Sequence, residues 1–191
     1  GGGDPQVLQE EIRTRIGRME EAFEEVNRLI RMAASRLAPD EEQAFLSLGD
    51  FLEEEVGFLR SNLYFKHHVE KIVEIEEALP ILKTLPEGLP QGLRSMLEAV
   101  AGDMERREMS RFGLRASAVE SGTLLEVTAG KGPLSRALLE GLQPAVSATQ
   151  RVSAEEMPAA HAGLMLARSG LSPEVEAGAE ETRIRFVVGK A

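Results

Sequence analysis

Apolar residues recur at alternating intervals of four and three over residues 7–37 of the sequence. They are Ile12, Ile16, Met19, Phe23, Val26, Ile30, Ala33 and Leu37. Glutamate and arginine fill most positions between them, so the pattern is a heptad seam with charged flanks, and it predicts one long helix. The following Ala38-Pro39-Asp40 ends this helix, because proline disfavours helix in the residue before it, and Asp40 is a suitable N-cap for a second helix.

A second apolar stripe of similar spacing runs over residues 41–64. Its members are Phe45, Leu48, Leu52, Val56, Leu59 and Leu63. Two antiparallel helices joined by a short loop bury only one seam, and a stable helical core needs two more helices. We therefore predict a helical hairpin that forms a four-helix bundle in a homodimer. The alternative is that the hairpin packs on the rest of its own chain.

The pattern changes beyond this hairpin, in a region broken by Pro80, Pro86, Gly88 and Pro90. Helices are predicted at residues 91–108, 134–142 and 158–169, and strands at residues 113–119, 123–128, 174–177 and 182–188. The first two strands are joined by a turn at Glu120-Ser121-Gly122. The expected fold class is α+β, with a dimerisation hairpin at residues 5–68 and an α/β domain at residues 69–191.

The composition excludes several classes of function. The formal net charge is −10, and an acidic chain gains nothing from releasing the counterions of phosphate groups, so we expect neither nucleic-acid nor anionic-membrane binding. There is no cysteine, which excludes disulfides, thiolate metal sites and cysteine nucleophiles and fits a reducing cytoplasm. No apolar run approaches the roughly 20 residues of a membrane span, so we expect a cytoplasmic location for this sequence.

One segment of the first predicted helix carries a motif. Residues 8–19 read LQEEIRTRIGRM and resemble the phosphoacceptor box of sensor histidine kinases, typically L-S-H-E-L-R-T-P-L-T-x-I. The likeness covers the run Glu11-Ile12-Arg13-Thr14, with an aliphatic residue at Ile16. Glu10 stands where the family has its phosphorylated His, and Arg15 stands where it has Pro.

The second half of the chain resembles the ATP-binding domain of the same family in four places. Residues 93–104 are similar to the N box, and residues 124–132, LLEVTAGKG, are similar to the strand and D-x-G-x-G loop. Residues 161–168, HAGLMLAR, resemble the G-L-G-L-A-L-A-R helix start, and residues 169–188 resemble the terminal hairpin. Because the four segments occur in the family's order, the resemblance implies a GHKL-like α/β sandwich after the hairpin.

The resemblance also implies which residues would bind ATP, and the sequence departs from most of them. Thr128 stands where the family reads adenine with an Asp, and Ala99 and Asp103 stand where it holds magnesium with Asn. Gly130 and Gly132 keep the glycines of the phosphate loop. We therefore expect these five residues to form an eroded pocket, with no cofactor, no metal and no active kinase.

A compact α/β domain on a helical hairpin is also similar to ChpT-type histidine phosphotransferases, which pass phosphate between response regulators without ATP. The family binds response regulators on the hairpin, so the resemblance implies a receiver-binding surface at Glu10, Glu11, Thr14, Arg15 and Arg18. Glu11 and Thr14 keep the E-x-x-T pair that acts in kinases with phosphatase activity. The alternative is that these residues are an ordinary solvated helical turn.

The three histidines are weighed separately. We expect His67 and His68 to lie at an exposed junction, the alternative being a relocated phosphoacceptor, and His161 to be packed or to cap its helix. Three functions stay open: a non-catalytic two-component signalling protein that binds response regulators to sequester or dephosphorylate them, a phosphorelay phosphotransferase that uses a non-standard His, and a structural dimer with an unrelated partner.

Overall fold

The computed structural model describes residues 14–19, 23, 26, 30, 47–82, 86–143 and 157–189, and the chain divides into two units after residue 39. In the first unit the described residues are helical, as predicted. The apolar stripe of this helix is exposed, by 49% at Ile16, 66% at Met19, 70% at Phe23, 52% at Val26 and 60% at Ile30. None of these five side chains is buried by the described chain.

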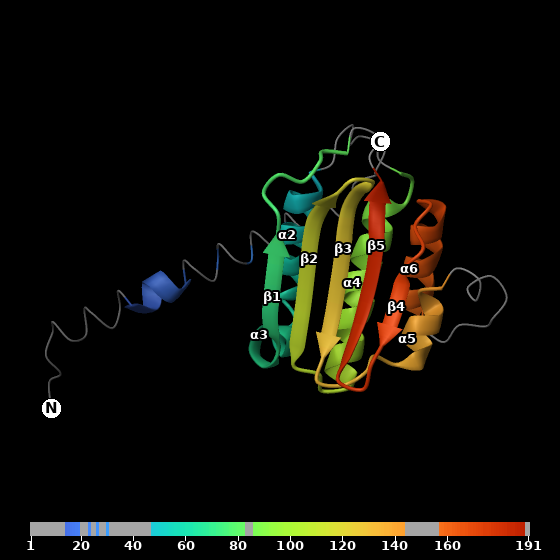
Figure 1. Ribbon diagram of the computed structural model, residues 1–191. Helices are drawn as coiled ribbons and strands as arrows, with labels where there is room; N and C mark the ends of the chain where they lie inside the picture. Colours follow the sequence, from blue (N-terminus) through green and yellow to red (C-terminus); the bar gives the residue numbers. More distant parts are fainter. Residues whose placement is uncertain are drawn as a thin grey trace, which may run out of the picture. The chain divides into compact units, whose positions relative to one another are not determined.

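A five-stranded sheet forms the centre of the second unit, with the strand order β1-β2-β3-β5-β4 (Figure 1). The strands are β1 (Glu70–Ile75), β2 (Arg111–Val119), β3 (Gly122–Gly130), β4 (Glu174–Ala177) and β5 (Glu181–Gly189). β1 runs parallel to β2, and the other neighbouring pairs are antiparallel. The β2–β3 hairpin and the terminal β4–β5 pair confirm the strands predicted there.

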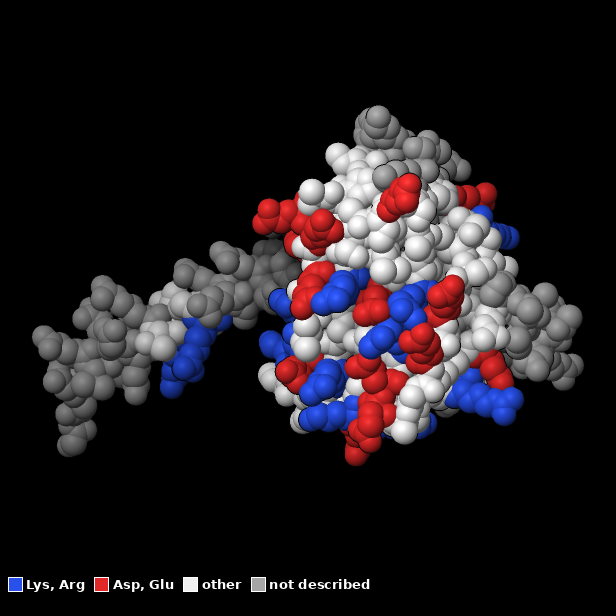
Figure 2. Space-filling view, in the orientation of Figure 1, with Lys and Arg blue, Asp and Glu red and all other residues white. Residues whose placement is uncertain are grey.

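Helices cover one face of this sheet (Figure 1). They are α2 (Leu48–Leu59), α3 (Leu63–His68), α4 (Leu89–Arg106), α5 (Arg136–Gly141) and α6 (Met157–Arg168). Strand side chains alternate accordingly. In β5, Ile184 and Phe186 are buried in the core, whereas Arg183 and Arg185 reach Glu126 on the opposite face. Figure 2 shows that open face, where arginine and lysine side chains alternate with carboxylates, so the core lies between the sheet and the helices.

The central helix of the core is α4, because its buried side is almost entirely apolar. Leu93, Leu97 and Val100 are at most 1% exposed. Gly92 allows a close approach to α6, since a Cβ atom at this position would lie 3.0 Å from the backbone nitrogen of Leu166. A larger residue would push the two helices apart, so Gly92 helps to hold the residues of α4 and α6 at a fixed spacing.

The second predicted helix is shorter than its stripe. Ser47 caps α2, which ends at Leu59, and Asn62 caps the separate helix α3 by accepting a hydrogen bond from the backbone of Phe65. As a consequence Leu63 is 73% exposed. The stripe residues Leu48, Leu52, Val56 and Leu59 are buried in the same core as the sheet. For α2, packing on its own chain is therefore the arrangement observed, and the four-helix bundle is not confirmed.

Strand β1 was not predicted from the sequence. Its residues read EKIVEI and follow α3 directly, with only Val69 between them. The strand nevertheless pairs along its whole length with β2. Within the part of the chain that the structure describes, no helix is long and apolar enough to cross a membrane.

Candidate functional site

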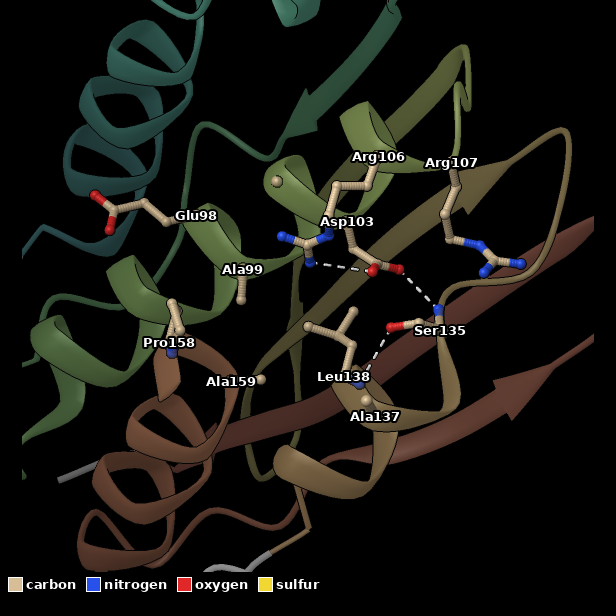
Figure 3. Close-up of a pocket in the computed structure, with 11 residues that line it drawn as sticks. Glu98, Ala99, Asp103, Arg106, Arg107, Ser135, Ala137, Leu138, Pro158 and Ala159 are labelled. Atoms are coloured by element: carbon tan, nitrogen blue, oxygen red, sulfur yellow. Dashed lines mark hydrogen bonds and ion pairs between the residues drawn. The ribbon is translucent and has the colours of Figure 1, made fainter. Parts of the chain in front are cut away.

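A pocket of about 430 Å³ opens between α4, the start of α5 and the first turn of α6 (Figure 3). Its lining residues are Glu98, Ala99, Gly102, Asp103, Arg106, Arg107, Ser135, Ala137, Leu138, Pro158 and Ala159. Two carboxylates and two guanidinium groups are among them, so the formal charges of the lining balance, and most of the other lining residues are small or apolar. Its shape depends on how these four charged side chains are held.

Asp103 is the buried charge of the pocket, with 2% of the residue exposed. Its Oδ1 accepts a hydrogen bond from Arg106 at 3.2 Å, and its Oδ2 accepts one from the backbone nitrogen of Ser135 at 2.7 Å. The hydroxyl of Ser135 in turn caps α5 by accepting a hydrogen bond from the backbone of Leu138 at 3.2 Å. Figure 3 shows this chain of contacts, through which Asp103 ties α4 to the start of α5.

The Gly130-Lys131-Gly132 loop is also held by the protein itself. The backbone nitrogens of Lys131 and Gly132 both donate to the carbonyl oxygen of Glu180, at 2.8 and 3.2 Å. Successive backbone N–H groups of this kind can form an anion-binding nest. Here a carbonyl oxygen fills that place, so these two donors are not free to bind phosphate.

The next residues of the same loop are anchored in turn. The carbonyl oxygen of Pro133 accepts a hydrogen bond from Arg107 Nε at 2.8 Å. The backbone nitrogen of Leu134 donates to the hydroxyl of the fully buried Thr182 at 3.0 Å. Together with Asp103, these contacts fix the loop between β3 and α5 against two other elements.

Only two of the five residues predicted for the pocket line it. Ala99 and Asp103 do, one helical turn apart on α4. Thr128 lies on the open face of the sheet, beside Gly113 of β2, where a Cβ atom would lie 2.2 Å from its Oγ1. The neighbouring residue Ala129 is the one that faces the core. Successive residues of a strand point to opposite faces, so Thr128 does not share the core-facing side of Ala129.

The glycines of the predicted phosphate loop do not line the pocket either. Gly130 packs against the side chain of Arg111, and Gly132 has a φ of +142° near Met109. These glycines therefore matter for the backbone: Gly130 allows close packing at the end of β3, and Gly132 allows the positive φ of the turn that follows. Sequence reasoning missed the pocket residues Arg106, Arg107 and Ser135, because their importance comes from tertiary contacts with Asp103 and the loop.

The residues present do not fit a magnesium-bound nucleotide. A hard cation needs carboxylate or carbonyl oxygens that are free to coordinate it. Both oxygens of Asp103 already accept hydrogen bonds, one of them from a guanidinium group that would repel a cation. Among the described residues there is no group of three or more His, Asp or Glu side chains that could hold a metal ion.

The residues predicted to bind a partner lie in the first unit. Glu10 and Glu11 are outside the described residues. Thr14, Arg15 and Arg18 belong to the described helical turns at residues 14–19, where all three are exposed. The Glu11–Thr14 pair therefore stays a prediction, and the charged residues of this surface that the structure describes are Arg15 and Arg18.

The histidines differ from one another in their surroundings. His67 and His68 are exposed at the end of α3, as predicted, and the ring of His68 stacks on Tyr64 at a centroid distance of 5.2 Å. His161 is neither packed nor at the helix end but exposed on α6. Its Nδ1 lies 3.0 Å from Ser95 Oγ of α4. Ser95 was not singled out from the sequence, because nothing in the sequence links residues 66 positions apart.

No protein-family profile matches the sequence, and no curated protein matches it. Solved structures do match the fold. A bacterial phosphotransferase is 18% identical, with a TM-score of 0.54 over 92% of this chain and 85% of that one. The catalytic domain of histidine kinase ThkA in nucleotide-free form is 10% identical, with a TM-score of 0.54 over 76% and 94%.

The histidine kinase ThkA has also been solved in complex with the response regulator protein TrrA. That structure is 11% identical to this chain, with a TM-score of 0.54 over 100% of this chain and 53% of that one. At such identities the likeness establishes the fold. The chain is thus histidine-kinase-like in structure, as the sequence motifs indicate.

Proposed function

We propose that this histidine-kinase-like chain acts in two-component signalling by binding the receiver domain of a response regulator, without ATP-dependent autophosphorylation. The fold supports the first part, because its structural neighbours include a phosphotransferase and a kinase solved with a response regulator. The pocket supports the second part. Both carboxylate oxygens of its buried Asp103 accept hydrogen bonds from within the protein.

The observation that carries the proposal is the state of Asp103. In a fold built like a kinase catalytic domain, the acidic residue at the magnesium position is instead a structural link between Arg106 and the backbone of Ser135. In such a chain the pocket residue Asp103 holds the loop before α5 in place of a magnesium ion. The fold can then serve to bind partner proteins rather than a nucleotide. Incubation with labelled ATP and magnesium should leave the protein unlabelled, and autophosphorylation would contradict the proposal.

The receiver-binding surface that we propose comprises Glu10, Glu11, Thr14, Arg15 and Arg18. Arg15 and Arg18 lie three residues apart on the described helical turns and are exposed. Residues at this spacing share one face of a helix, so both can contact one partner. A receiver that carries a phosphoryl group on an aspartate presents negative charge, which two arginines attract and orient.

Binding is tested by isothermal titration of the full chain with a panel of receiver domains, phosphorylated and unphosphorylated. For a receiver that binds, the double variant Arg15→Glu/Arg18→Glu should weaken binding about tenfold or more, because two rim attractions become repulsions. The control is Arg136→Glu, which reverses one charge of the same kind at a side chain that is 92% exposed on α5 and pairs with Glu140. Equal affinity of the double variant and the control would place the surface elsewhere.

A substitution of Thr14 tests whether the protein dephosphorylates a bound receiver or only sequesters it. If the protein accelerates loss of phosphate from a bound receiver, Thr14→Ala should slow that loss to the receiver's intrinsic rate, because the hydroxyl that orients the attacking water is gone. Thr14→Ser, which keeps the hydroxyl, should retain most of the acceleration. A wild-type protein that binds the phosphorylated receiver without accelerating hydrolysis acts by sequestration.

A homodimer is part of the same proposal. The exposed apolar stripe of the first helix has the heptad spacing of a coiled-coil seam. A second copy would cover Ile16, Phe23 and Ile30 with the same residues of its own helix. Such a dimer would present two receiver-binding surfaces.

A further inference from the structure

Strand β1 is an edge strand, and no strand of the described residues pairs with its outer edge (Figure 1). The backbone nitrogens of Glu70 and of Glu76, just after the strand, donate to carbonyl oxygens on the β2 side at 2.9 and 3.0 Å. Successive residues of a strand turn their N–H and C=O groups to opposite edges, so those of Lys71, Val73 and Ile75 point away from β2. Such an edge is a template on which another strand can pair.

The open face of the sheet carries a row of side chains whose charge alternates from strand to strand. In register, the row consists of Glu74, Arg115, Glu126, Arg185 and Glu174. A second row begins in the same way, because Glu70 stands opposite Arg111, whose Nε lies 3.6 Å from the carboxylate. Both rows start with a carboxylate on β1 whose side chain is more than half exposed. The alternation would therefore continue with positive charges on a strand added beside β1.

Between the two glutamates of β1 lies Ile72, an apolar residue that the sheet leaves 44% exposed. Its neighbour in register on β2 is Gly113, which has no side chain to cover it. Both residues line a hollow of about 310 Å³ on the open face. Side chains directly opposite each other on paired strands lie about 5 Å apart, so a large apolar residue on an added strand would pack on Ile72.

We propose that the outer edge of β1 binds an extended segment of a partner protein as a sixth strand, and that this segment reads basic, large apolar, basic at alternate positions. Hydrogen bonds to the backbone of Lys71, Val73 and Ile75 supply affinity, and the side chains opposite Glu70, Ile72 and Glu74 supply specificity. The proposal concerns the α/β unit alone and does not depend on the receiver-binding surface.

A second copy of β1 is a poor occupant of the same edge. Two identical edges related by a two-fold axis pair antiparallel. A pair centred on Ile72 would place Glu70 of one copy opposite Glu74 of the other, and a pair centred on Val73 would place Glu70 opposite Glu76. Like charges that stand directly opposite each other destabilise a strand pair. The glutamates thus oppose self-association and leave the edge open to a basic strand.

The first test measures binding of a fluorescein-labelled peptide, Thr-Lys-Thr-Phe-Thr-Lys-Thr, to the full chain by fluorescence anisotropy. One control peptide carries Glu in place of Lys, and the other has the same composition in the order Lys-Lys-Thr-Thr-Thr-Phe-Thr. Both should bind at least about tenfold more weakly, because the first meets like charges and the second lacks the alternation. The net charge of the chain is −10. Equal binding of the reordered peptide would therefore indicate a general attraction and overturn the proposal.

N-methylated peptides separate strand pairing from side-chain attraction. Two versions of the first peptide keep every side chain and carry methyl groups on the backbone nitrogens of one edge each. One version should lose binding at least about tenfold, because its methylated nitrogens cannot donate to β1, and the other should retain binding. The version that fails reports the direction of the added strand. Equal affinity of the two versions would overturn the proposal.

Variants of the glutamates test where the peptide binds. The double variant Glu70→Gln/Glu74→Gln should weaken binding of the first peptide about threefold to tenfold, since two exposed charge pairs are lost. The matched control is Glu174→Gln/Glu176→Gln, which makes the same change on β4 at the other edge of the sheet and should leave the affinity unchanged. Equal effects of the two double variants would overturn the proposal. Unchanged circular dichroism spectra confirm that the variants remain folded.

A variant of the apolar position tests the side chain between the glutamates. Ile72→Ala should weaken binding at least about threefold, because the phenylalanine of the peptide loses apolar area on which to pack. The control is Leu164→Ala on α6, where the side chain is equally exposed, at 45%, and the affinity should not change. Equal affinities of the two variants would show that the peptide does not cover Ile72.

Amide hydrogen exchange reports on the edge itself. In the free chain, the amides of Lys71, Val73 and Ile75 should exchange rapidly, because they have no partner strand. A saturating concentration of the first peptide should slow all three at least about tenfold. Binding without such protection would overturn the proposal. Slow exchange at these amides in the free chain would overturn it as well, because a second copy or another segment of the chain would then already cover the edge.

Discussion

The two apolar stripes of the sequence have nearly the same spacing and different surroundings. In α2, the side chains of Leu48, Leu52 and Val56 are at most 2% exposed and belong to the core of the α/β unit. In the first helix, the corresponding side chains of Phe23 and Val26 are 70% and 52% exposed. The comparison shows that a three-four pattern identifies a helix face that must be buried. The pattern does not identify the element that packs against that face.

Charged residues beside the two stripes explain part of the difference in burial. Beside its apolar face, α2 carries Glu55, whose side chain is 6% exposed and pairs with Arg94 of α4 at 3.0 Å. Arg94 also lies over the ring of Phe51, 6.0 Å from its centroid. A buried ion pair of this kind specifies one partner helix, because the charge would be costly to bury anywhere else. The seam of the first helix, in contrast, is a plain heptad pattern that suits an identical helix.

The largest effect should follow from a cavity in the buried stripe. Leu52→Ala removes a side chain that is 1% exposed, and such substitutions cost about 2–5 kcal/mol because the surroundings collapse only partly into the space. Urea unfolding followed by circular dichroism would measure the loss. The matched control is Leu63→Ala, at the exposed end of the same sequence stripe, which should change the free energy of unfolding by less than about 0.5 kcal/mol. Equal losses would contradict the difference in burial.

A smaller effect should follow from the ion pair that connects α2 to α4. Arg94→Ala removes a charge partner of the buried Glu55, and we expect a loss of about 1–3 kcal/mol in the free energy of unfolding, reduced from a fully buried case because the arginine side chain is 19% exposed. The double variant Glu55→Gln/Arg94→Ala should recover part of this loss, since no charge is left in the interior. A double variant no more stable than the single one would show that the carboxylate charge is not the cause.

The sequence predicted those parts of the fold whose pattern is local. The β2–β3 hairpin was predictable because β-branched and small residues surround a clear turn at Ser121-Gly122, and the termini of α4 agree with the predicted helix within about two residues. β1 was missed because its six residues, EKIVEI, mix charged and aliphatic residues without strict alternation and follow a helix without glycine or proline. The break between α2 and α3 was missed because the apolar spacing continues across it to Leu63.

The candidate site was predictable to the same extent. Ala99 and Asp103, which the resemblance to the N box singled out, lie four residues apart on one face of α4 and both line the pocket. Thr128 lies on the open face of the sheet, and the face of a strand residue changes with a shift of one position, which a motif alignment does not fix. The contacts of Asp103 with Arg106 and Ser135, and the contact of Ser95 with His161, depend on how helices pack in three dimensions. No spacing rule in the sequence contains that information.

The smallest effect on the stability of the α/β unit, and the sharpest test of the comparison, should come from the exposed stripe. Phe23→Asp places a charge in the seam of the first helix, where the side chain is 70% exposed, so the free energy of unfolding of the α/β unit should change by less than about 0.5 kcal/mol. If a second copy covers the seam, the same substitution should halve the mass measured by light scattering, because two facing carboxylates would have to be buried together. Phe23→Leu, which keeps an apolar residue, should retain the larger mass. A wild-type chain that is already monomeric would contradict a second copy as the partner of the exposed stripe.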